Sequence, residues 1–132
     1  MAMKFATKNW IDTANYDLKT AEAMLTSRRF IYVVFMCHLS LEKMIKAIIS
    51  TQIEGLPPKS HGILYLSEKA LVQFPEDLQE FIEQLDNVSV VTRYPEDLKK
   101  LSKEFNKNKA EKILSLTRRT LRWLRRDQRL KT

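Results

Sequence analysis

The residues best suited to acid–base chemistry lie in the most apolar stretch of this chain. Residues 37–47 read CHLSLEKMIKA, with FIYVVFM before them and II after them. At about 100° per residue, His38, Glu42 and Lys46 fall on one stripe of a helix, together with apolar residues. Such a group can transfer protons or bind a polar ligand near neutral pH. Buried polar groups also form paired contacts that only fix the fold, so both interpretations remain open.

A carboxylate interrupts another apolar helix face. A helix is expected over about residues 8–26, and Asp17 lies on its apolar face. The apolar members of that face are Trp10, Ala14, Leu18, Ala21 and Leu25. A turn at residues 27–28 would bring Asp17 level with His38, and Lys43 is the next nearest candidate. Because a buried carboxylate needs a partner, we predict an Asp17–His38 hydrogen bond, either structural or part of a ligand-binding or catalytic cluster.

Other catalytic chemistry has little support. The chain has two histidines and one cysteine, so we expect no metal site. Gly55 and Gly62 are the only glycines, which excludes a glycine-rich phosphate loop, and we expect no cofactor. The lone thiol of Cys37 suits a reducing cytoplasm, where we expect the protein. We expect no membrane crossing, because the longest uncharged run, residues 30–41, is shorter than the roughly 20 residues that a spanning helix needs.

Positive charge is concentrated near the C-terminus. The chain has a net charge of +7, and residues 118–131 contain seven basic residues and one acid. Six arginines of this segment fall within about one-third of a helix circumference, and they are Arg118, Arg119, Arg122, Arg125, Arg126 and Arg129. This face is either solvated or a binding surface for a polyanion.

The same C-terminal helix carries two apolar strips. Ile113, Leu121 and Leu124 form the first, and the second contains Leu116, Trp123 and Leu130. The second strip predicts a further packing surface, which either a fifth helix or a second subunit would cover.

Apolar spacing predicts an all-α fold, an antiparallel up-and-down bundle of four to five helices that forms one domain over residues 1–132. Ser60 is expected to cap a helix over 62–72. A fourth helix begins at Pro75, with residues 89–98 as a loop or short turn. Asn108 and Glu111 resemble a capping box for the last helix. The first three predicted helices cover about residues 8–26, 29–51 and 62–72. The fourth begins at residue 75, and the last runs from residue 108 to about residue 126.

Four segments in this order resemble the HEPN domain family: WIDTANYDLKTAEAML, YVVFMCHLSLEKMIKAII, PPKSHGILYL and TRYPEDL. The resemblance spans about residues 10–98 and then a matching long final helix. It implies an antiparallel helical bundle that commonly forms homodimers. It also implies a possible partner, a separately encoded minimal nucleotidyltransferase, often in a toxin–antitoxin pair. Many of the toxins are metal-independent RNases with an Arg and a His separated by a short gap.

That RNase pattern is absent, because no histidine follows His61 and Arg29 is too far from His38. We therefore assign no catalytic residue. The positions that match the family, and that we take as ligand-binding candidates, are Asp17, His38, Glu42, Lys43, His61, Arg93 and Tyr94.

Three functions remain open. The leading hypothesis is a non-catalytic HEPN-like module that binds a nucleotide, RNA or the nucleotidyltransferase. The alternative is an RNase in which His38 or His61 is the acid–base group and Arg93 stabilises phosphate charge. A third is a purely structural partner protein.

Overall fold

The computed structural model describes residues 2–131, and these form six α-helices and one 3₁₀ turn with no strand. The helices are α1 (Phe5–Thr26), α2 (Phe30–Ser50), α3 (Ile63–Lys69), α4 (Glu76–Arg93), α5 (Leu98–Glu104) and α6 (Lys107–Arg125), and the turn is Gln128–Leu130. The all-helical bundle expected from the sequence is confirmed. Two helices of seven residues each, α3 and α5, raise the number above the four or five expected.

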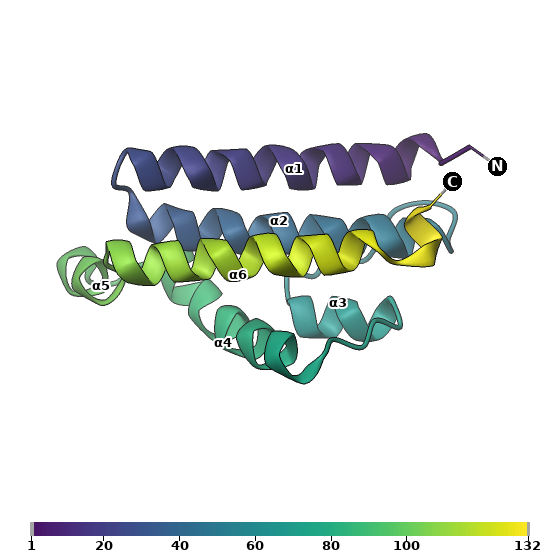
Figure 1. The fold of residues 1–132 in the computed structure, drawn as a ribbon. Coiled ribbons are helices and arrows are strands. Elements are labelled where there is room, and N and C mark those ends of the chain that lie inside the picture. Colours follow the sequence, from purple (N-terminus) through teal and green to yellow (C-terminus); the bar gives the residue numbers. More distant parts are fainter. Residues whose placement is uncertain (1, 132) are drawn as a thin grey trace.

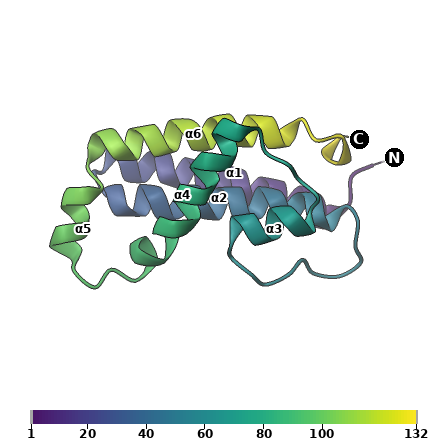
Figure 2. The same ribbon diagram turned by 90° about the horizontal axis from the view of Figure 1, so that it is seen from below.

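Helix α2 is the centre of the structure. It contacts each of the other five helices. In Figure 1, α1 lies along one side of α2, α6 runs beside them, and α3 and α4 lie on the opposite side. Figure 2 shows α4 crossing α2 at a steep angle while α1, α2 and α6 run roughly along one axis. No helix within residues 2–131 is both long enough and apolar enough to cross a membrane.

The α1–α2 turn reverses the chain without a glycine. Arg28 adopts φ 63°, and the amide of Arg29 donates to the carbonyl of Met24 at 2.8 Å. Leu71 closes α3 in the same way, with φ 55°. Both ends are Schellman motifs, in which a left-handed residue lets the next amides satisfy the last helical carbonyls. The αL conformation costs a side-chain-bearing residue about 1–2 kcal/mol, so the surrounding packing must maintain both turns.

The second apolar strip, expected to contain Leu116, Trp123 and Leu130, is partly covered within the chain. The Trp123 ring lies against Phe74, with ring centroids 5.3 Å apart, and Leu130 is buried. Leu116 is half-buried against the main hydrophobic core. The segment before α4 therefore covers part of this strip, for which the sequence predicted a further helix or a second subunit.

Three predicted boundaries were wrong. Residues 89–93 extend α4 instead of forming a loop. Gly62, rather than Ser60, is the N-cap of α3, although the Ser60 hydroxyl does accept the Gly62 amide. The last helix is capped by Asn106, whose Oδ1 accepts the Lys109 amide at 3.0 Å, two residues before the expected cap.

Candidate functional site

Three elements meet at the carboxylate of Asp86, on α4. Its Oδ1 accepts a hydrogen bond from His38 Nε2 at 2.8 Å and from the Ile63 amide at 3.0 Å. Its Oδ2 accepts the Leu64 amide at 2.9 Å. Burial alone raises the pKa of Asp86, but the hydrogen bonds from His38, Leu64 and Ile63 outweigh it and hold the pKa below its usual range. Asp86 thus joins α2 to α4 and caps α3.

His38 is a structural residue in this arrangement. Its side chain is 1% exposed. Since Asp86 is an acceptor, the ring proton lies on Nε2, and the buried Nδ1 has no hydrogen-bond partner among residues 2–131. A ring held this way cannot reach a substrate in solvent.

The predicted Asp17–His38 bond is wrong. Asp17 is buried as expected, but Lys43 is its partner, with Nζ 2.7 Å from Oδ2 in an ion pair that lacks regular hydrogen-bond geometry. His38 and Lys43 are five residues apart, which places them about 140° apart around α2. Lys43 therefore faces α1, and His38 faces α4.

Glu42 connects a buried ion pair to a surface histidine. Its side chain is 4% exposed, and its Oε2 accepts from Lys46 Nζ at 3.1 Å. Lys46 Nζ also lies 5.6 Å from the centroid of the Trp10 ring. On the outer side, Glu42 Oε1 lies 3.2 Å from Nδ1 of His61, whose side chain is 61% exposed. Glu42 therefore holds one ring nitrogen of His61 and leaves Nε2 toward solvent.

A surface hollow of about 350 Å³ brings some of the candidate residues together. His61 and Tyr94 line it, and so does Asp86, which links it to His38. The side chain of Arg93 lies outside the part of the chain that the structure describes. Of the seven candidates, His38, Glu42, His61 and Tyr94 thus belong to one region, while the Asp17–Lys43 pair lies between α1 and α2.

Asp86 is the residue that sequence reasoning missed. It lies 48 residues from His38, so no local pattern connects the two. One feature of the sequence could have indicated that Asp86 has a partner. It lies four residues after Ile82, which places its carboxylate at the edge of the apolar stripe of α4.

The six C-terminal arginines, of which Arg126 and Arg129 follow α6, are compensated more than the local sequence indicated. Four of the six make polar contacts. Arg118 pairs with Glu22 at 2.6 Å, Arg119 with Asp77, Arg125 with Asn15 and Arg129 with Asp127. Glu22 and Asp77 come from α1 and α4, so acids distant in the sequence neutralise part of this face.

Arg122 and Arg126 differ from the other four arginines. Both are exposed, one helical turn apart, and neither pairs with an acid within residues 2–131. Burial, and then the charge of Arg122, lower the pKa of Arg125. We call Arg122, Arg125 and Arg126 the arginine ridge. Within the same described range, no group of three or more His, Cys, Asp or Glu side chains is placed to hold a metal ion.

The family model of the HEPN domain matches residues 7–127. The chain belongs to the HEPN domain family. Two solved structures share its fold, TT1696 from Thermus thermophilus and ST0689, described as an archaeal HEPN homologue. The first has a TM-score of 0.76 at 23% identity, and the second 0.72 at 22%; each match covers 92% of this chain and 97% of the other. No curated protein matches the sequence. The HEPN fold is thus established here at low sequence identity.

The Asp17–Lys43 pair predicts that its two alanine mutants differ in how much they lower the free energy of unfolding. Lys43→Ala should lower the free energy of unfolding by about 3 kcal/mol, because it leaves a buried carboxylate without its ion partner. Asp17→Ala should cost about 1 kcal/mol, because the partly exposed Lys43 can extend to water. Urea unfolding of both variants and the double variant measures this; equal costs would contradict the assignment.

The Asp86 carboxylate predicts a pH-dependent contribution. Asp86→Asn should cost about 2 kcal/mol at neutral pH, because three charge-assisted hydrogen bonds become neutral ones. Since the folded pKa lies below the unfolded value, this contribution is complete above about pH 4 and is lost as pH falls through the folded pKa.

The difference between the parent and Asp86→Asn should therefore shrink in acid, as measured by urea unfolding at several pH values. Asp97→Asn is the control, because Asp97 caps α5 from an exposed position and Asn caps helices equally well. A constant difference from neutral pH to about pH 3 would rule out the ionised carboxylate as the source.

Proposed function

We propose that this HEPN protein is a non-catalytic module that binds RNA through the arginine ridge. The observation that carries the proposal is the exposure of Arg122 and Arg126 without acidic partners in the described chain. Residues 118–131 contain seven basic residues and one acid. Glu22 and Asp77, which pair with two of these arginines, raise the number of acids to three, so positive charge remains in excess. Guanidinium groups bind phosphate in a bidentate geometry, and an anion would relieve the repulsion between Arg122 and Arg125.

The length of the basic surface favours a polymer over a single nucleotide. From Arg118 to Arg125, α6 rises about 10 Å, at about 1.5 Å per residue, and Arg126 and Arg129 follow it. Several phosphates of one strand can contact such a surface, whereas a mononucleotide presents one phosphate cluster. Backbone contacts of this kind give affinity with little sequence preference.

RNA binding should depend on salt through the two free arginines. The double variant Arg122→Gln, Arg126→Gln should reduce the slope of log affinity against log salt by about two, one for each lost phosphate contact. Fluorescence anisotropy with a mixed-sequence RNA measures the slope. Lys99→Gln, Lys103→Gln removes the same charge from exposed positions on α5. An equal change in both variants would indicate only net charge, and no binding at low salt would refute the proposal.

A homodimer is part of the proposal, on a different surface from the strip on α6. At the end of α4, Val90 is 65% exposed, Val91 45% and Tyr94 73%. They line one hollow of about 440 Å³ beside α5. Exposed apolar groups this close together mark a contact surface, and a symmetric pair would bury the patch against its own copy. HEPN domains commonly form homodimers.

Charges placed in this patch should shift the protein toward the monomer. Val90→Glu, Val91→Glu keeps good helix formers while adding two charges that a second copy would have to bury. Multi-angle light scattering should give a dimer for the parent and for Leu56→Glu, a similarly exposed control elsewhere. A parent monomer at high concentration would remove the dimer and leave the patch to the separately encoded nucleotidyltransferase.

A metal-independent RNase is the second candidate, and His61 is the residue that favours it. Glu42 holds His61 Nδ1 while the side chain remains 61% exposed beside Tyr94. A carboxylate that fixes the histidine tautomer is the arrangement of a general base. His38 is unsuitable, since it is buried against Asp86.

We expect no cleavage of a mixed-sequence RNA in EDTA, because His61 stands alone in the described part of the hollow as a proton carrier near neutral pH. His61→Ala is the informative control, because an exposed side chain can be removed without unfolding the bundle. Cleavage by the parent that His61→Ala abolishes would replace the binding module with the RNase.

A further inference from the structure

A second concave surface lies between α4 and α6, away from the His61 hollow. The start of α4 is tied to α6 by the Asp77–Arg119 pair, whereas Asp86 ties its later part to α2 and α3. Beyond its start α4 diverges from α6, as Figure 2 shows, and α5 lies near the open end. The resulting cleft has a volume of about 670 Å³, within the range of small-molecule sites.

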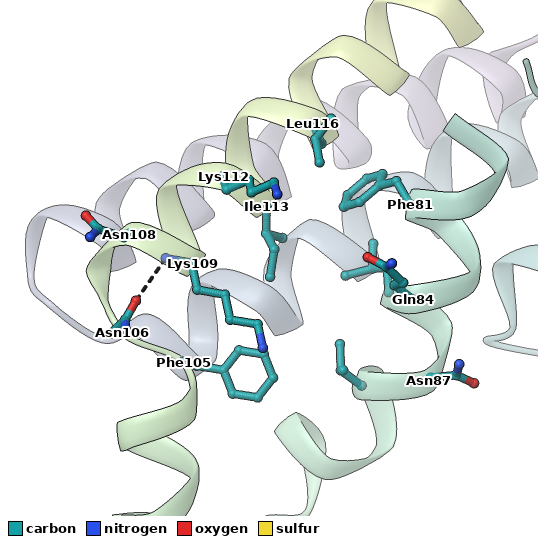
Figure 3. A pocket seen from close by; sticks show the side chains of 12 residues that line it. Phe81, Gln84, Asn87, Phe105, Asn106, Asn108, Lys109, Lys112, Ile113 and Leu116 are labelled. Atoms are coloured by element: carbon teal, nitrogen blue, oxygen red, sulfur yellow. Dashed lines mark hydrogen bonds between the residues drawn. The ribbon is translucent and has the colours of Figure 1, made fainter. Parts of the chain in front are cut away.

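The floor of the cleft is apolar. Figure 3 shows side chains from α4, the end of α5 and α6 converging on it. The apolar lining residues are Phe81, Leu85, Val88, Phe105, Ile113 and Leu116. All six belong to the main hydrophobic core or pack against it, so the floor is a rigid part of the fold.

The rim of the cleft carries positive charge without any acid. Lys109 and Lys112 line it together with amide side chains, and no Asp or Glu is among the described lining residues. Lys109 Nζ lies 4.6 Å from the centroid of the Phe105 ring, and Lys112 has no ion-pair partner in the described chain. Gln84 and Asn87 are the lining residues with amide side chains that α4 contributes (both labelled in Figure 3). The apolar floor and the cationic rim therefore complement a molecule that has an apolar body and a negatively charged group.

We propose that this cleft binds a small amphipathic anion, with an aliphatic or aromatic body on the floor and a carboxylate near Lys109 and Lys112. An apolar body removes the floor from water, and the lysines select the sign of the head group. The site is separate from the arginine ridge, because Lys112, the nearer rim lysine, is ten residues from Arg122, or about 15 Å along α6. The proposal does not rest on RNA binding.

Octanoate is the probe, and octylammonium has the same body with the opposite charge. Isothermal titration calorimetry with the full chain should show binding of octanoate with a millimolar or lower dissociation constant, and at least tenfold weaker binding of octylammonium. Equal affinity for both probes would overturn the charge selection. No octanoate binding at about 10 mM would overturn the site, and tighter binding of AMP would overturn the ligand class.

Variants locate the site. Lys109→Gln, Lys112→Gln should weaken octanoate about tenfold, from two exposed charge contacts, and Lys99→Gln, Lys103→Gln should leave it unchanged. Gln84→Glu adds an acid to the rim at nearly constant shape and should weaken octanoate, whereas Gln73→Glu, outside the cleft, should not. Circular dichroism confirms folding of each variant. The proposal would be overturned if the control variants weakened octanoate binding as much as the cleft variants do, or if the cleft variants left it unchanged.

Discussion

The fold depends on one partly buried carboxylate and the donors that satisfy it. Asp86 receives the His38 ring and the first two amides of α3, from elements that are 22 to 48 residues away in the sequence. Without that acceptor, three donors would lose their partner. The carboxylate also ties the later part of α4 to α2 and α3, where α4 has diverged from α6 and the cleft opens.

The polar residues in the apolar centre of α2 therefore serve the fold before any chemistry. His38 connects α2 to α4, Lys43 connects it to α1, and Glu42 is shared between Lys46 and His61. Each buried charge meets an opposite charge or a hydrogen-bond donor, as the low dielectric of a core requires. Groups available for binding lie outside this centre, on the arginine ridge, in the α4–α6 cleft and at His61.

Sequence patterns predicted well which helix faces are buried, but they predicted poorly which polar side chains pair with one another. The apolar face of α1 showed that Asp17 is buried, because helical periodicity is a local property. The choice of Lys43 over His38 depends on how side chains point around α2, which backbone register alone does not define. Glu22 and Asp77 were invisible as partners of α6 for a related reason, since tertiary folding brings them there from α1 and α4.

The state of the His38 ring tests the central claim most directly. Long-range ¹H–¹⁵N NMR distinguishes a ring protonated on Nε2 from one protonated on Nδ1 and shows how fast that proton exchanges with water. The Asp86 contact requires a proton on Nε2, protected from exchange by burial. A proton on Nδ1 alone, or rapid exchange typical of an exposed histidine, would contradict a structural His38 and return it to the candidate acid–base groups.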